Sequence, residues 1–330
     1  MNKIHAKSPC CRTPFRRFGG RRRQCLVCFK TWRIRKKRRG RKRKRVDVKI
    51  AIDLLTNTET IRNKARRSRF SERSVRIGIR RSLAALNRQD WNTDVSGDKL
   101  VLIADGLWSN IGGRRWVTYL LAVRPLNSNK AMLLPPIFLF GTENKQKWNC
   151  VLNLIPTEIQ LKIVALVADG IAGMSNLAKQ KGWVFQQCQF HFIKVFQRFR
   201  GRKISTLRHK ALREESYRLI LKVMKLPYGA EYEQVIGRIE ELAAREECPK
   251  WVKLHLRGFL RYREYFRAYI KFPQYNLPAT TSAMESLCAS IRDFLRRSRG
   301  FRTVELFQQW VSAFIKVRSK IKCSGRNQPN

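Results

Sequence analysis

Acidic residues are scarce in this chain of 330 residues, where 23 Asp and Glu stand against 71 Lys and Arg. The formal net charge is +48 and the sequence pI is about 11.1, so we expect a polyanionic partner. Hydrophobic residues still make up 43% of the chain and aromatic residues 10%. This much apolar surface collapses into one or more cores, which excludes a wholly disordered basic tail.

Long apolar runs are also absent from the sequence. No stretch approaches the ~20 apolar residues that a membrane-spanning helix needs, and the N-terminus MNKIHAKSPCCR has no apolar run to act as a signal peptide. We therefore expect an intracellular protein with no membrane partner. The nine cysteines, an odd number, fit metal-bound or buried thiols in a reducing compartment better than a disulfide framework.

Basic charge is densest near the N-terminus, where the first 45 residues contain no Asp or Glu. The run KKRRGRKRKR at 36–45 is too repulsive to fold alone, so 35–45 is predicted to be a flexible arm that lies along a nucleic-acid groove. Each phosphate that Lys or Arg neutralises releases a counterion, which gives affinity without sequence information. A nuclear-localisation signal or a ribosome-like extension is the alternative.

Four cysteines lie within the first 34 residues, and Cys25-Leu-Val-Cys28 forms a C-x-x-C pair. Two such pairs make a zinc ribbon, so 1–34 is predicted to be a zinc-ribbon-like module. The first pair is irregular because the adjacent Cys10 and Cys11 cannot both easily point at one ion. His5 is then a candidate fourth ligand, or Cys10 takes that position; a degenerate ribbon with unused cysteines is the alternative. The candidate zinc ligands are Cys10, Cys11, Cys25, Cys28 and His5.

Helical spacing begins at Val46 and predicts three short helices over 46–90. Thr58 is a candidate N-cap of the second helix, and Ser71 begins the third, whose apolar residues recur from Val75 to Leu86. An arginine-bearing third helix suits the major groove of DNA, so this segment is predicted to be a helix-turn-helix domain. A small helical bundle with a solvated basic face is the alternative. The candidate DNA-binding residues here are Arg73, Arg76, Arg80 and Arg81.

Two predicted buried strands, 100–104 and 163–168, are each followed by an Asp-Gly pair, at Asp105 and Asp169. The C-terminal ends of strands are where α/β sheets place their sites. Such an aspartate often only caps the next turn. In a chain this basic, however, Asp105 is the only acidic residue between Asp98 and Glu143. Binding phosphate needs no carboxylate, whereas holding Mg²⁺ against a scissile phosphate does, so these residues predict a divalent-metal site.

The order of elements around these aspartates indicates an α/β fold with an RNase H-like core. Further strands are predicted at 116–123 and 132–140, then a helix at 143–154. The core is expected over 98–203 and 278–320, interrupted by an all-α insertion over 204–277 and preceded by the zinc ribbon and the helix-turn-helix.

Glu285 is a candidate third carboxylate, near the start of a helix that the segment TTSAME begins. The alternative is a helix-start carboxylate that only favours the helix dipole or completes a capping box. A last helix is predicted over 304–317. Four arginines that follow Glu285 are suited to a DNA backbone, with a solvated basic face as the alternative: Arg292, Arg296, Arg297 and Arg299.

Four segments together, VLIADGLW, VALVADGIAG, QCQFHFIKVFQRF and LPATTSAMESLCASIRDFLRRSRG, resemble the Mutator-like transposases. The similarity covers essentially the whole chain and favours the prokaryotic insertion-sequence branch that begins with a zinc ribbon. It implies an Asp-Asp-Glu triad of Asp105, Asp169 and Glu285, with Cys188 and His191 as the Cys-x-x-His motif that positions DNA or packs the active site. A core thiol and a helix-start histidine are the alternative for these two residues. Two features depart from the family, the irregular first cysteine pair and Ala283-Met284 where Asn-Arg is common.

The resemblance implies a DNA transposase in which two Mg²⁺ ions, or Mn²⁺, are held by the triad. Water would cleave the strand at the element end, and the freed 3′-OH would join target DNA. The implied partners are double-stranded DNA of the element ends and the target, with a homodimer in the DNA complex, in the prokaryotic cytoplasm or nucleoid. Two alternatives are a non-catalytic sequence-specific DNA-binding regulator and an RNase H-like nuclease that cuts without joining.

Overall fold

The computed structural model describes residues 7–20, 22–33, 60–91, 95–200, 209–297, 301 and 303–323. The chain divides into two compact units, 1–45 and 46–330. His5, Arg299, the predicted basic arm and the first part of the predicted helix-turn-helix lie outside the described residues. The domain limits expected from the sequence stay predictions.

The N-terminal unit contains a small antiparallel sheet in the order β1 (Phe15–Arg17), β2 (Arg22–Cys25) and β3 (Thr31–Arg33). Phe15 and Trp32, on the two outer strands, pack edge to face with ring centroids 5.3 Å apart. This contact covers one face of a sheet that has few residues to bury.

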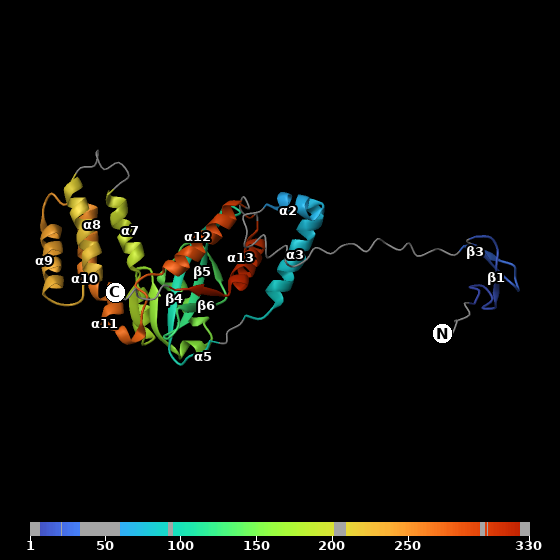
Figure 1. Ribbon diagram of the computed structural model, residues 1–330, viewed down its shortest axis with the longest axis horizontal. Coiled ribbons are helices and arrows are strands. Elements are labelled where there is room, and N and C mark those ends of the chain that lie inside the picture. Colours follow the sequence, from blue (N-terminus) through green and yellow to red (C-terminus); the bar gives the residue numbers. More distant parts are fainter. Residues whose placement is uncertain are drawn as a thin grey trace. The chain divides into compact units, whose positions relative to one another are not determined.

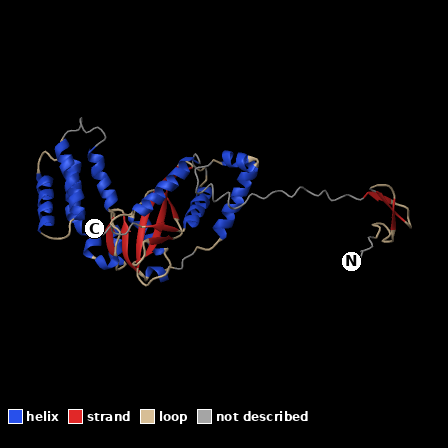
Figure 2. Cartoon of the chain, viewed as in Figure 1, coloured by secondary structure: helices blue, strands red, loops and turns tan. Residues whose placement is uncertain are grey.

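A mixed sheet forms the centre of the second unit (Figures 1 and 2). Three antiparallel strands, β4 (Leu100–Ile111), β5 (Arg114–Pro125) and β6 (Lys130–Leu133), come first in the chain. Helix α4 (Lys145–Asn153), β8 (Ile163–Ala168), α6 (Met174–Gln180) and β9 (Val184–Gln187) follow. The strand order is β6-β5-β4-β8-β9, with β8 parallel to β4 and β9 parallel to β8. This arrangement is compatible with the predicted RNase H-like core.

Strand β4 does not end before Asp105, so the prediction that both aspartates follow a strand is wrong for this residue. The strand continues to Ile111. Asp105 lies in the middle of β4, where it pairs with Leu120 of β5. The apolar alternation goes on through the buried Leu107 and Ile111. Gly112 and Gly113, both with positive φ, then make the tight turn into β5.

The strand predicted over 132–140 is two strands, because Pro135 and Pro136 supply no N–H for a ladder. Strand β7 (Ile137–Phe140) pairs with the first half of β5. A further strand that the sequence did not predict, β10 (Lys320–Lys322), pairs with β6. The short helix α5 (Thr157–Gln160) leads into β8.

The two faces of the sheet have separate cores. Leu100 and Leu102 pack with residues of α4 and α6. Val101 and Ile103 point the other way and pack with α12 (Ser282–Arg297) and α13 (Val304–Arg318). Since side chains alternate along a strand, Asp105 lies on the α12 face of the sheet.

Helices α2 (Ile61–Ser68) and α3 (Glu72–Arg88) lie in the segment predicted to be a helix-turn-helix. Thr60 caps α2, so Thr58, which lies outside the described residues, is not its N-cap as predicted. The Ser71 cap of α3 is confirmed, because its hydroxyl accepts a hydrogen bond from the Ser74 N–H at 3.1 Å. The apolar residues of α3 share a core with α13, and Asn87 donates to the Gln309 carbonyl at 3.0 Å.

The described part of the predicted insertion, 209–277, is helical, and its helices stand beside the sheet together with the last helix of the predicted first core segment (Figure 1). Helices α7 (Gln189–Arg200), α8 (Lys210–Lys225), α9 (Ala230–Ala244) and α10 (Lys250–Phe266) enclose an apolar core of their own. The buried Arg267 donates hydrogen bonds to the Val223 and Leu226 carbonyls at the end of α8. The last carbonyls of a helix have no hydrogen-bond partner within the helix, so Arg267 satisfies them. Helix α11 (Ala268–Lys271) and the 3₁₀ turn η2 (Pro273–Tyr275) return to α12. None of the described helices has an apolar stretch that could cross a bilayer.

Candidate active site

Asp105, Asp169 and Glu285 come from distant parts of the chain and meet around His191. Asp105 lies in β4, Asp169 directly after β8, and Glu285 in the first turn of α12. Ligand atoms of Asp105, His191 and Glu285 all lie within 4.8 Å of one another. Asp169 is next to them, with its Oδ1 3.8 Å from Nδ1 of His191. The structure thus brings together the three carboxylates singled out in the sequence.

Asp105 is the most buried of these carboxylates, with 6% of the residue exposed. Its Oδ1 accepts the Gly106 N–H at 2.8 Å, and its Oδ2 has only the weak thiol donor of Cys288 at 3.8 Å. Burial, and then the charge of Glu285, raise the pKa of Asp105 to about 7. A cation in the cavity would favour the ionised form, because it offsets both effects.

The imidazole of His191 lies between the carboxylates of Glu285 and Asp169. Its Nε2 is 2.5 Å from Oε1 of Glu285. Burial lowers the pKa of His191, but its contacts with Cys188, Glu285 and Asp169 outweigh this and raise it to about 11. Hydrogen bonding to His191 in turn lowers the pKa of Glu285. A protonated imidazole therefore stands between Glu285 and Asp169 where a metal ion would also be stabilised.

Cys188 is completely buried and connects the sheet to the helix that carries Glu285. Its N–H donates to the Ala168 carbonyl at 2.8 Å, at the end of β8. Its sulfur accepts hydrogen bonds from the backbone N–H and the hydroxyl of Thr281, both at 3.2 Å. A buried thiol does not reach DNA, so of the two roles expected for Cys188 the packing of the site fits its position.

Glu143 is a fourth carboxylate in the same cavity, and no motif in the sequence pointed to it. It precedes α4 and accepts hydrogen bonds from two indoles, Trp108 Nε1 at 3.0 Å and Trp148 Nε1 at 2.8 Å. Burial raises the pKa of Glu143. The two tryptophans come from β4 and α4, so only the folded chain shows that they share a partner.

The four carboxylates line a cavity of about 610 Å³ that also has basic and aromatic walls. The walls come from α7, α10 and α12, so one helix of the predicted insertion, α10, lines a side of the site. Residues on these walls include Lys194, Arg198, His255, Tyr262 and Arg292. An acidic floor under a basic rim suits phosphate groups with divalent cations between them.

The glycines of the two Asp-Gly pairs leave space for polar side chains. A Cβ at Gly106 would lie 2.5 Å from Oε1 of Glu143. A Cβ at Gly170 would lie 1.8 Å from Nε2 of Gln187. Both positions therefore need glycine for close approach, and any larger residue would displace a side chain that lines the cavity.

The donor atoms around the cavity fit a hard divalent cation. Carboxylate oxygens from separate elements are the ligands that Mg²⁺ and Mn²⁺ prefer, and one imidazole is compatible with Mn²⁺. The buried Oδ2 of Asp105, with its single thiol donor, is a further sign of fit. Asp105, Glu285 and His191 form a group that could hold such an ion, and Asp169 lies next to His191.

The described arginines among those predicted to contact DNA lie at the surface of two helices. On α3, Arg73, Arg76, Arg80 and Arg81 are all exposed. Glu72 pairs with Arg76 at 3.3 Å, which leaves this arginine less available to phosphate.

On α12 the predicted arginines differ in their contacts. Arg292 is 4.0 Å from Glu285 and lines the cavity, so it lies closest to the carboxylates. Arg296 pairs with the Asp293 carboxylate, and Arg297 donates to the Asp293 carbonyl at 3.2 Å.

In the N-terminal unit, Cys10, Cys11, Cys25 and Cys28 form a second cluster, with all four sulfurs within 4.8 Å of one another. The sulfurs of the adjacent Cys10 and Cys11 both lie in this cluster, and Arg12 has a positive φ directly after the pair, so this geometry favours the predicted alternative in which Cys10 takes the fourth position. Hydrogen bonds from Thr13, the backbone and Ser8 lower the pKa of Cys25 to about 5. The cluster is compatible with zinc.

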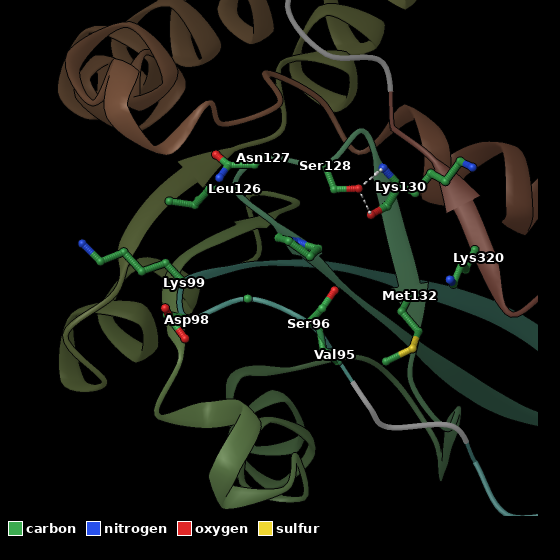
Figure 3. A pocket seen from close by; sticks show the side chains of 12 residues that line it. Val95, Ser96, Asp98, Lys99, Leu126, Asn127, Ser128, Lys130, Met132 and Lys320 are labelled. Atoms are coloured by element: carbon green, nitrogen blue, oxygen red, sulfur yellow. Dashed lines mark hydrogen bonds between the residues drawn. The ribbon is translucent and has the colours of Figure 1, made fainter.

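A second cavity, of about 630 Å³, lies where β4 begins and β5 ends (Figure 3). Its lining includes Lys99, Lys130 and Lys320, with Asp98 as its one carboxylate. Ser128 uses its hydroxyl on the backbone of Lys130, accepting at 3.0 Å and donating at 3.2 Å. This lining contains no histidine or cysteine, and its single carboxylate does not make a set of metal ligands.

No protein-family model and no curated protein matches the sequence. Among solved structures, the chain is similar to the "Drosophila P element transposase strand transfer complex", with 13% sequence identity and a TM-score of 0.44. The match covers 85% of this chain and 94% of that chain. A similarity this weak adds nothing to the argument from the site.

Proposed function

We propose that this protein is a DNA transposase of the Asp-Asp-Glu type, which cleaves element ends and joins the freed 3′-OH to target DNA. The observation that carries the proposal is the meeting of Asp105, Asp169 and Glu285 in one cavity. Carboxylates that share one cavity repel one another, and a site that binds phosphate alone does not need them. In a chain of net charge +48 they are best explained by divalent cations held against a DNA phosphate.

In the proposed mechanism Asp105, Asp169 and Glu285 would hold the divalent cations. Two bound Mg²⁺ or Mn²⁺ ions would stabilise the attacking and leaving oxygens of an in-line displacement. Arg292, next to Glu285, would bind a non-bridging phosphate oxygen. His191 would hold a proton between Glu285 and Asp169, inside the cavity that binds the phosphate. No covalent link between protein and DNA is required.

The rest of the chain would select and hold the DNA. The exposed arginines of α3 would contact the element end, and the zinc-bound cysteine cluster would stabilise the small N-terminal sheet. We further propose membership of the Mutator-like, prokaryotic insertion-sequence branch, action in the prokaryotic cytoplasm or nucleoid, and a homodimer that holds two ends together. Sedimentation of the complex with element-end DNA tests the last point.

The decisive experiment incubates the protein with Mg²⁺ and a labelled duplex that carries the inverted repeats flanking its gene. We expect a nick at the repeat end and, with added target DNA, a joined product. Asp169→Asn should lose both products, whereas Glu158→Gln, which changes an exposed carboxylate on α5, should keep them. Cleavage without joining would identify a nuclease instead. Binding without any cleavage would identify a regulator and refute the proposal.

A further inference from the structure

Glu143 has an environment that its place in the fold does not require. It lies in the segment before α4, where Asn144 already caps the helix by accepting the Lys147 N–H at 2.9 Å. The carboxylate is therefore free of the capping role that an acidic residue at a helix start often has. It enters the cavity of the three other carboxylates instead.

The Glu143 carboxylate accepts hydrogen bonds from two neutral indole N–H groups, one on α4 and one on β4. Trp148 is 1% exposed and packs edge to face on Tyr119, so its indole N–H is a fixed donor. Trp108 is 44% exposed and supplies the second N–H. Each carboxylate oxygen accepts one of these bonds, which leaves lone pairs on both oxygens for another partner.

Among the described residues, His191 offsets part of the charge of Glu143, but no basic group lies within ion-pair distance of this carboxylate. The ion pairs of the described chain do not include it, and Asp169 lies close enough to oppose its ionisation. A partly buried carboxylate beside others is unfavourable unless a cation balances it. The backbone also makes room for it, because only glycine at 106 leaves its Oε1 uncrowded.

We infer that Glu143 is a positioning residue for the divalent cations of the proposed reaction, acting through the hydration shell of the ion that Asp169 holds. This inference rests on the proposed function. The two indoles keep the carboxylate in place, so that it orders the shell without replacing Asp105, Asp169 or Glu285 as a ligand. Outer carboxylates of this kind typically contribute 10–100-fold to metal affinity.

The test measures Mn²⁺ binding to the full chain by electron paramagnetic resonance, with thermal unfolding of each variant recorded without metal. We expect Glu143→Gln to weaken Mn²⁺ binding by about 10-fold. Glu158→Gln should bind as the unchanged chain does. Trp108→Phe keeps the carboxylate and removes one donor, so it should weaken binding less, with an unaltered melting temperature. This second variant also carries the test if Glu143→Gln does not fold.

Each outcome decides between the two claims. Unchanged Mn²⁺ affinity in both Glu143→Gln and Trp108→Phe overturns the role of Glu143 and leaves the proposed function intact. Loss of binding as complete as in Asp169→Asn also overturns it, because Glu143 would then be a direct ligand. If Asp169→Asn itself binds Mn²⁺ like the unchanged chain, the proposed function has failed.

Discussion

Asp105→Asn should stabilise the metal-free protein while abolishing its activity. Asp105 has 6% of its surface exposed, and its pKa rises from an ordinary value of 3.8 to about 7 in the folded chain. Because the folded state holds the proton more tightly than the unfolded state, ionising Asp105 destabilises the fold as the pH rises between these two values. The full effect corresponds to roughly 4 kcal/mol, since one pKa unit is about 1.4 kcal/mol.

The variant carries no charge at this position, so its advantage should grow with pH. We expect the free energy of unfolding of the variant to exceed that of the unchanged chain by roughly 1 to 2 kcal/mol at pH 5 and by roughly 4 kcal/mol at pH 8. Asparagine retains an oxygen to accept the Gly106 N–H, so the local geometry has no reason to change. Urea unfolding with a metal chelator at both pH values measures the difference, and saturating Mg²⁺ should reduce it. An equal or lower stability of the variant at pH 8 would refute the reasoning.

Three further changes test other parts of the structure. Gly106→Ala should push the Glu143 carboxylate off its two indoles and lower cleavage by about 10-fold with an unchanged circular dichroism spectrum, a result that normal cleavage would contradict. We expect the unchanged chain to contain one zinc and Cys28→Ser to contain none, as measured by elemental mass spectrometry. Retention of one zinc per chain in the variant would rule out the cysteine cluster as the zinc site. Arg80→Gln should reduce the slope of log affinity for DNA against log salt by about 0.9, whereas Arg76→Gln should change it less because Glu72 already pairs with Arg76; equal slopes for both would count against this surface.

Local periodicity was sufficient to predict the parts of the site that lie on buried elements. The apolar runs before Asp105 and Asp169 predicted β4 and β8, and the spacing after Glu285 predicted α12, all of which are confirmed as elements. The cores on each face of the sheet follow the same alternation. Elements with strong patterns therefore place their own side chains reliably.

The remaining features depend on contacts between segments that have no local signal. Glu143 joins the site only because the extended hairpin of β4 and β5 carries Trp108 across from α4. His191 reaches Glu285 through the packing of α7 against the start of α12, and β10 forms by pairing at a sheet edge. The position of Asp105 within its strand was missed because the two glycines at 112–113 were not recognised as a hairpin turn.

Because β4 and β8 pair in parallel register, the meeting of Asp105 and Asp169 depends on the number of residues in each strand as much as on their types. Ile103 of β4 pairs with Val167 of β8. Asp105 and Asp169 each follow this pair by two residues, so their carboxylates are directed to the same side of the sheet. Deleting one residue between 100 and 104 would turn the Asp105 carboxylate to the opposite surface, into the apolar layer around Trp148. One aliphatic residue can replace another in this segment, but gain or loss of a single codon there would separate the two carboxylates by the thickness of the sheet.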